Sequence, residues 1–191
     1  MDLSWLPDDG GTGHMPPSKE VVDFWKKVKE HTDFKTLVEI GFNAGHSSSI
    51  ILTLFEDTKI LSHDIGQFDI TLRNGELVKD KFKNRFDLVI KNSLSIQPSE
   101  INGNDVLFID GGHDYEIVSK DIELFINSDI QYLVLDDMQH RGVKKAYANY
   151  LNNDNYQLIH KQHYEAILPS HMRNTGVKNV IVPVYLIKKI K

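Results

Sequence analysis

Short apolar runs alternate with amphipathic stretches between residues 34 and 151. Runs that are apolar on both faces are typical of central parallel strands, and apolar residues repeated at the helical period indicate helices. The pattern predicts strands at 36–40, 59–62, 86–90, 105–109 and 132–135, and helices at 47–55, 72–82, 115–126 and 143–151. Strands and helices in alternation favour an α/β fold, a doubly wound Rossmann-like sheet that is mostly parallel.

The two ends of the chain follow other patterns. Residues 1–17 are rich in Gly, Pro and Asp, which predicts a flexible N-terminal arm or lid, or a terminus without a role. A helix with apolar residues at the helical period follows Ser18, and the whole of 18–191 is expected to form one domain. Extended segments at 156–160 and 179–187 predict an antiparallel hairpin at the sheet edge, with Pro183 at an edge or bulge.

The composition narrows the classes of function. With 191 residues and 40% hydrophobic content, the chain can bury one sizeable core. A net charge of −5 argues against nucleic acid or anionic lipid as a partner. The absence of cysteine excludes disulfides, thiolate zinc sites and cysteine nucleophiles.

The N-terminal residues carry neither the basic head nor the apolar core of a signal peptide, and no apolar run reaches the ~20 residues that span a bilayer. We therefore expect a cytoplasmic protein without a membrane partner. A homodimer is compatible with the sequence.

The first predicted strand runs into a glycine-containing turn, Glu39-Ile-Gly41-Phe-Asn43-Ala-Gly45-His-Ser47. Glycine lets the backbone approach a ligand, and ligands of α/β sheets bind beyond the carboxyl ends of the strands. The spacing is neither the dinucleotide Gly-x-Gly-x-x-Gly nor a Walker loop, which argues against pyrophosphate binding. A purely structural turn is the alternative.

Polar residues also follow the second and third strands. Asp64 ends the second strand, where nucleotide-binding α/β folds hold ribose hydroxyls, although a solvated aspartate is the alternative. Asn92 and Ser93 follow the third strand, and either contacts to an adenosine or a simple helix cap would suit them.

The strongest cluster is divided between the ends of the fourth and fifth strands. Phe-Ile-Asp110-Gly-Gly-His113 closes the fourth strand, and Leu-Asp136-Asp137 closes the fifth. If the two strands are neighbours, three carboxylates converge, and a divalent cation would relieve their repulsion. Oxygen ligands favour Mg²⁺, Mn²⁺ or Ca²⁺ over Zn²⁺. Helix caps and solvated loop acids are the alternative, and His140 is expected at a solvated helix start.

These motifs together resemble those of class I S-adenosylmethionine-dependent methyltransferases. The likeness is greatest to the compact, metal-dependent group allied to macrocin and catechol O-methyltransferases, the methyltransferase domain 24 type. It covers roughly residues 34 to 150, and Phe-Ile-Asp110-Gly-Gly-His113-Asp-Tyr115 is its most specific part. The extra helices that precede the sheet in catechol-type enzymes are here reduced to one and a short arm, so their acceptor pocket does not transfer.

The resemblance implies a role for each matching residue. Asp64 would bind the ribose hydroxyls, Asp110, Asp136 and Asp137 would bind Mg²⁺, and His113 would be the general base. The residues expected to hold S-adenosylmethionine are Glu39, Gly41, Asn43, Gly45, Ser47, Asp64, Asn92, Ser93 and Asp110.

The expected function is methylation of a hydroxyl on a small molecule, catechol-like or sugar-like. A metal-independent small-molecule methyltransferase and a catalytically idle cofactor-binding domain are the alternatives. Residues 1–17 and 161–178 carry no motif that identifies the acceptor.

Overall fold

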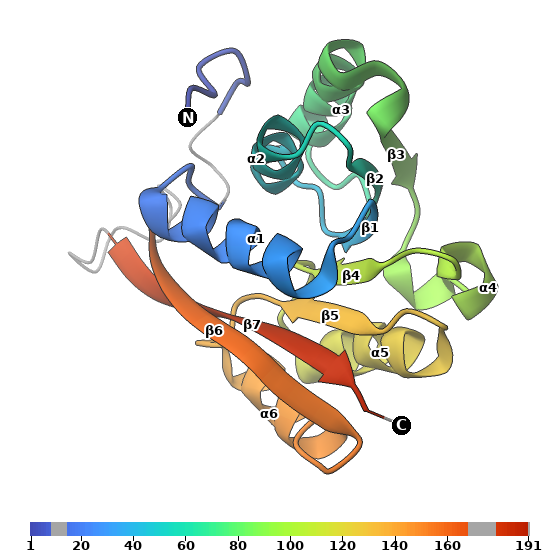
Figure 1. Ribbon diagram of the computed structural model, residues 1–191. Coiled ribbons are helices and arrows are strands. Elements are labelled where there is room, and N and C mark those ends of the chain that lie inside the picture. The colour runs from blue at the N-terminus through green and yellow to red at the C-terminus, as the bar shows by residue number, and fades with distance from the viewer. Residues whose placement is uncertain (9–14, 168–178, 191) are drawn as a thin grey trace.

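The computed structural model describes residues 1–8, 15–167 and 179–190, and it contains one mixed sheet flanked by helices (Figure 1). The strands are β1 (Thr36–Ile40), β2 (Lys59–Asp64), β3 (Phe86–Ile90), β4 (Val106–Ile109), β5 (Tyr132–Leu135), β6 (Tyr156–Ile167) and β7 (Asn179–Lys189). The α-helices are α1 (Lys19–Thr32), α2 (His46–Leu54), α3 (Asp69–Phe82), α4 (Pro98–Ile101), α5 (Tyr115–Asn127) and α6 (Arg141–Tyr150). Two short 3-10 helices, η1 (Lys83–Arg85) and η2 (Ser93–Ser95), lie on either side of β3.

The sheet has the strand order β3-β2-β1-β4-β5-β7-β6. The first five strands pair in parallel, whereas β7 is antiparallel to both β5 and β6. The order reverses between β1 and β4, and this is the point at which doubly wound sheets bind ligands. The predicted fold class, including the antiparallel C-terminal hairpin, is confirmed.

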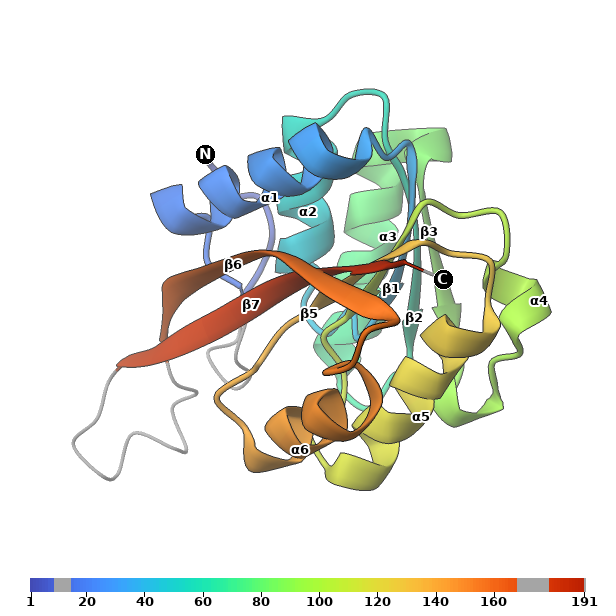
Figure 2. The ribbon, with the colours of Figure 1, turned by 60° about the horizontal axis from the view of Figure 1, so that its bottom comes forward.

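Helices cover both faces of the sheet, as Figure 2 shows, with α1, α2 and α3 on one face and α4, α5 and α6 on the other. Each face has its own apolar core. Trp25 and Phe108 pack edge to face in the first core, and Val118, Ile122 and Phe125 of α5 pack in the second. No helix in the described parts of the chain is long and apolar enough to cross a membrane.

The C-terminal hairpin is longer than the sequence predicts. β6 continues to Ile167, so residues 161–167, which were expected to be irregular, pair with β7. Pro183 does not mark an edge, because β7 lies between β5 and β6. It is tolerated because β5 pairing ends at Leu135↔Tyr185, so the missing N–H interrupts no bond to β5. The strand at the edge is β6, which carries an irregularity between Leu158 and His160.

The described ends of the N-terminal arm pack against the body of the protein. Leu3, Leu6 and Met15 are buried in the first core. The amide of Asn74 in α3 donates hydrogen bonds to the carbonyl oxygens of Pro7 (2.9 Å) and Ala44 (2.8 Å). Residues 1–8 and 15–17 are therefore packed, as a lid or a simply packed terminus would be, while 9–14 lie outside the described residues.

Candidate functional site

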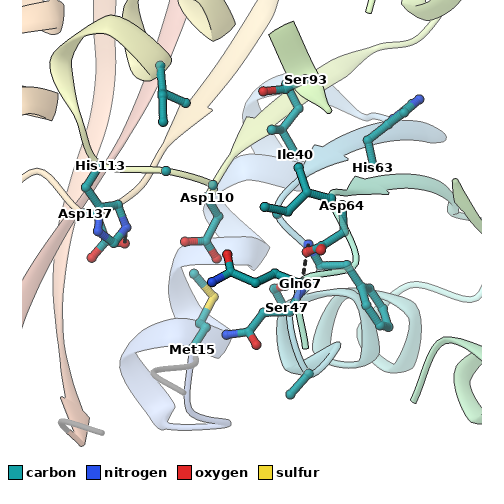
Figure 3. A pocket seen from close by; sticks show the side chains of 18 of the residues that line it. Met15, Ile40, Ser47, His63, Asp64, Gln67, Ser93, Asp110, His113 and Asp137 are labelled. Atoms are coloured by element: carbon teal, nitrogen blue, oxygen red, sulfur yellow. Dashed lines mark hydrogen bonds and ion pairs between the residues drawn. The ribbon is translucent and has the colours of Figure 1, made fainter. Parts of the chain in front are cut away.

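A cavity of about 640 Å³ opens beyond the carboxyl ends of the parallel strands. Loops after β1, β2 and β3 supply one half of its lining, and the ends of β4 and β5 with the β6–β7 hairpin supply the other. In the view of Figure 3, Asp64 lies on one side, His113 and Asp137 lie together on the other, and Asp110 lies between them. The predicted residues that line this cavity are Gly41, Asn43, Gly45, Ser47, Asp64, Asn92, Ser93, Asp110, His113 and Asp137.

The loop between β1 and α2 passes unusually close to the end of β4. At Gly41, which has φ +96°, an added Cβ would lie 2.2 Å from the carbonyl oxygen of Asp110. Gly45 has φ +80° and occupies the N-cap of α2. Only glycine adopts such backbone conformations without strain, and the first N–H groups of a helix have no partner within the helix. The loop therefore packs closely against the end of β4 and offers a ligand hydrogen-bond donors at the start of α2.

Glu39 lies behind this loop and does not line the cavity. Its side chain is fully buried and accepts hydrogen bonds from the hydroxyls of Ser47, Ser48 and Ser62. Burial raises the pKa of the carboxyl, and the three hydroxyls act against that rise. Glu39 is not among the cavity-lining residues, and its carboxylate contacts α2 and β2. Its contact with the cofactor stays a prediction.

Asp64 ties the loops after β1 and β2 together. One carboxylate oxygen accepts from the backbone N–H groups of Phe42 (3.0 Å) and Asn43 (2.9 Å), and the other accepts from Gly66 (2.7 Å). Asn92 caps η2 by accepting from Leu94 N–H (3.0 Å), so the alternative of a cap holds for a residue that also lines the cavity. Asp64 and Asn92 therefore each stabilise a loop and also line the cavity.

Three aspartates lie close together where β4 and β5 end. Burial, followed by the charges of Asp136 and Asp137, raises the pKa of Asp110 well above its ordinary value. Asp136 is buried, and burial together with the charge of Asp137 raises its pKa to about 8. Its oxygens accept hydrogen bonds from Tyr164 Oη (2.6 Å) and Asp137 N–H (2.8 Å), and its side chain is not part of the cavity lining.

Asp137 pairs with an imidazole at the edge of the cavity. His113 Nε2 lies 2.6 Å from Asp137 Oδ2. Burial opposes ionisation of both groups, but their mutual attraction dominates, so the pKa of Asp137 is lowered and that of His113 is raised. Asp137 has φ +58°, a strained conformation for a residue other than glycine, and Gln139 donates to its second oxygen. A second imidazole, that of His140, stacks on His113 with 4.1 Å between ring centroids.

The structure brings together a different set of potential metal ligands from the predicted one. Among the described residues, His113, Asp137 and His140 form the group whose ligand atoms all lie within 4.8 Å of one another. Asp110 and Asp137 of the predicted carboxylate set line the cavity, while Asp136 is directed to Tyr164. His140 lies at a solvated helix start, as the sequence predicts, since it is the N-cap of α6 and its side chain is 45% exposed, and it also lines the cavity.

Several lining residues carried no signal in the sequence. Met15, Tyr164, Ala166, Val180 and Val182 come from the arm and the C-terminal hairpin, and all five look like ordinary core positions. Only the alternation of Val180 and Val182 along the predicted extended segment hinted that these two share a face. The place of the four hairpin residues in the cavity depends on how the hairpin joins the sheet.

Comparisons with known proteins show the family of the chain. The model of a family described as a methyltransferase domain matches residues 38–138, which is more than half of the chain. No curated protein sequence matches the chain significantly.

Solved structures resemble the whole fold at low sequence identity. A provisionally assigned RNA methyltransferase from Pyrococcus horikoshii has a TM-score of 0.69 and 12% identity, over 97% of this chain and 90% of that one. The O-methyltransferase TomG from Streptomyces achromogenes, in complex with S-adenosylmethionine, has a TM-score of 0.63 and 11% identity, over 91% and 81%. An O-methyltransferase from Bacillus cereus, in complex with S-adenosylhomocysteine, has a TM-score of 0.61 and 14% identity, over 97% and 86%. At these identities the likeness shows the fold alone.

Proposed function

The chain belongs to the methyltransferase domain family and has the class I fold of S-adenosylmethionine-dependent methyltransferases, and from this premise we propose that it methylates a hydroxyl oxygen of a small molecule. The observation that carries the proposal is the single cavity that joins the glycine loop and Asp64 to the His113–Asp137 pair. A net charge of −5 and a concave site of about 640 Å³ favour a small acceptor over nucleic acid.

The loop half of the cavity suits S-adenosylmethionine. An ionised carboxylate has about four acceptor positions. Asp64 uses three of them for backbone N–H groups, and it keeps one for a ribose hydroxyl. The lack of a Cβ at Gly41 lets the loop after β1 pass against the backbone of Asp110, so both can lie beside the methionine part of the molecule. When bound there, S-adenosylmethionine supplies an electrophilic methyl on a sulfonium sulfur, which keeps the bonding electron pair as the new C–O bond forms.

His113 takes the proton that the acceptor hydroxyl loses. Asp137 fixes the orientation of the imidazole and stabilises its protonated form, because the two groups are 2.6 Å apart. Since the same carboxylate raises the pKa of His113, the imidazole is a stronger base than an isolated histidine. The proton then leaves to solvent, to which the His113 side chain is 40% exposed.

We also propose that a divalent cation assists the reaction. Burial and the charges of neighbouring aspartates raise the pKa values of Asp110 and Asp136, and a hard cation would favour the ionised form of such carboxyls. Asp110 and Asp137, which line the cavity, would hold Mg²⁺, or Mn²⁺ or Ca²⁺, with the imidazole of His140 beside Asp137. Asp136, the third ligand that the resemblance implies, would have to turn from Tyr164 to join them. The ion would lower the pKa of the acceptor hydroxyl.

Titration calorimetry tests the cofactor part of the proposal. We expect S-adenosylmethionine and S-adenosylhomocysteine to bind, and NAD and ATP to bind much more weakly, because the loop lacks both phosphate-binding motifs. Binding of NAD without either sulfur nucleotide would contradict the proposal.

Turnover assays separate the remaining alternatives. Loss of activity with EDTA and its recovery with Mg²⁺ would support the cation. Activity that persists in EDTA would favour the metal-independent enzyme. Cofactor binding without methylation of phenols or glycosides would favour a catalytically idle domain.

A further inference from the structure

The half of the cavity that is lined by the ends of β4 and β5 and by the β6–β7 hairpin is called the acceptor half. One of its walls is apolar. In the β6–β7 ladder, Tyr164 pairs with Val182 and Ala166 pairs with Val180. Because side chains alternate along a strand, these two cross-strand pairs share one face of the hairpin, and all four residues line the cavity. Met15 lies beside them in the lining. We call these five residues the apolar wall.

The apolar wall presents no free hydrogen-bonding group. The hydroxyl of Tyr164 is already used, since it donates to Asp136 (2.6 Å). The sulfur of Met15 accepts from Trp25 Nε1 (3.4 Å). The remaining three side chains are aliphatic. A ligand against this wall therefore meets a tyrosine ring, methyl groups and a thioether.

Polar groups in this half gather at the other side, around the proposed base. His113, Asp137, Gln139 and His140 come from the ends of β4 and β5, and they complete the lining there. The acceptor half is thus divided into one apolar side and one side that handles a hydroxyl and its proton.

We propose that the methyl acceptor is a hydroxylated aromatic, whose ring lies against the apolar wall and whose hydroxyl faces His113. This inference rests on the proposed function and names the substrate class for it. An aromatic ring gains from burial against aliphatic groups and from contact with the methionine sulfur. A sugar carries hydroxyls around its whole ring, and those turned to the wall would lose their hydrogen bonds to water without replacement.

The hairpin offers a matched control for a test. Ile181 is 57% exposed, whereas its neighbour Val182 is 2% exposed on the face that lines the cavity. Replacing valine by threonine keeps the shape and adds a hydroxyl. Val180→Thr with Val182→Thr therefore makes the wall polar, and Ile181→Thr introduces a threonine hydroxyl on the outer face instead. Ala166→Phe is a second variant that fills the space in front of the wall.

The experiment measures binding of 4-nitrophenol and of methyl β-D-glucopyranoside to protein saturated with S-adenosylhomocysteine. We expect the phenol to bind the wild type and Ile181→Thr equally, the threonine pair about tenfold more weakly, and Ala166→Phe not at all. Circular dichroism and S-adenosylhomocysteine affinity, unchanged in every variant, show that each protein is folded.

Three outcomes overturn the inference: the glucoside binds as tightly as the phenol, the threonine pair binds the phenol as the control does, or Ala166→Phe leaves phenol binding intact. A wild type that fails to bind S-adenosylhomocysteine contradicts the proposed function instead. In that event the phenol titration on protein without the nucleotide still tests the wall.

Discussion

The carboxylates in the two halves of the cavity have different neighbours. In the loop half, Glu39 accepts from three serine hydroxyls, which act against the rise of its pKa on burial, and Asp64 accepts from three backbone N–H groups. In the acceptor half, burial and the charges of neighbouring aspartates raise the pKa of Asp110 well above its ordinary value and that of Asp136 to about 8. Hydrogen-bond donors thus offset the effect of burial in the loop half, whereas neighbouring negative charges add to it in the acceptor half.

This difference separates a preorganised binding site from a reactive one. Hydrogen bonds that are complete before a ligand arrives fix the shape of a loop, which suits recognition of a constant cofactor. Carboxyls with raised pKa values and an ion-paired histidine are typical of active sites, where catalysis needs groups with shifted pKa values. The four predictions below test whether recognition and chemistry are divided in this way.

The largest expected effect is that of His113→Ala. Removing a general base typically lowers kcat by about 10²- to 10⁴-fold, and affinity for S-adenosylhomocysteine should stay unchanged because the imidazole belongs to the other half. His31→Ala, at an exposed position at the end of α1, is the control. Equal loss of cofactor affinity and kcat would show that the two halves do not act separately.

Leu6→Ala tests whether the docked arm belongs to the folded core. Leu6 is buried in the first core, and removal of a buried leucine side chain costs about 2–5 kcal/mol of unfolding free energy. The free energy of unfolding in urea measures this, with exposed Ser4→Ala as the control. A variant of normal stability that turns over slowly would favour the alternative in which the arm acts only as a lid.

Asp64→Ala should affect the loop half alone. Loss of charge-assisted hydrogen bonds of about 1.5–3 kcal/mol weakens cofactor affinity by roughly 10- to 100-fold. Asp69→Ala, an exposed position in the first turn of α3, serves as the control. Calorimetric affinity equal to that of the wild type would remove Asp64 from the cofactor site.

Asp136→Asn tests the uncompensated charge through the pH dependence of stability. The folded-state pKa of Asp136 is raised from 3.8 to about 8, so its contribution to stability is complete below pH 3.8 and is lost as the pH rises through 8. Asparagine resembles the protonated acid at every pH and can still accept from Tyr164. We expect the variant, without added cation, to lose less stability than the wild type between pH 5 and about pH 8.

Thermal unfolding at a series of pH values measures this effect, and Mg²⁺ added to the wild type should reduce the same loss. A parallel decline of both proteins with pH would show that Asp136 carries no excess charge in the folded state.

Local patterns were enough to predict the central sheet and most of the loop half. The apolar runs of β4 and β5 indicate buried strands. A parallel sheet brings the carboxyl ends of its strands to one edge, and the residues at these ends are Gly41, Asp64, Asp110 and Asp137. Strand pairing then places Asp110 next to Gly41 without further information. Such features depend on residues close in sequence and on one topological rule, which is why the sequence alone determined them.

Only the tertiary structure decided the direction of individual polar side chains and the composition of the acceptor half. Glu39 turns to three serines and Asp136 turns to Tyr164, partners up to 28 residues distant that no local pattern identifies. The apolar wall joins an N-terminal methionine to a hairpin near the other end of the chain. The physical reason is that burial and hydrogen bonding are satisfied by whichever groups the whole fold brings together, and periodicity along the sequence does not record those long-range choices.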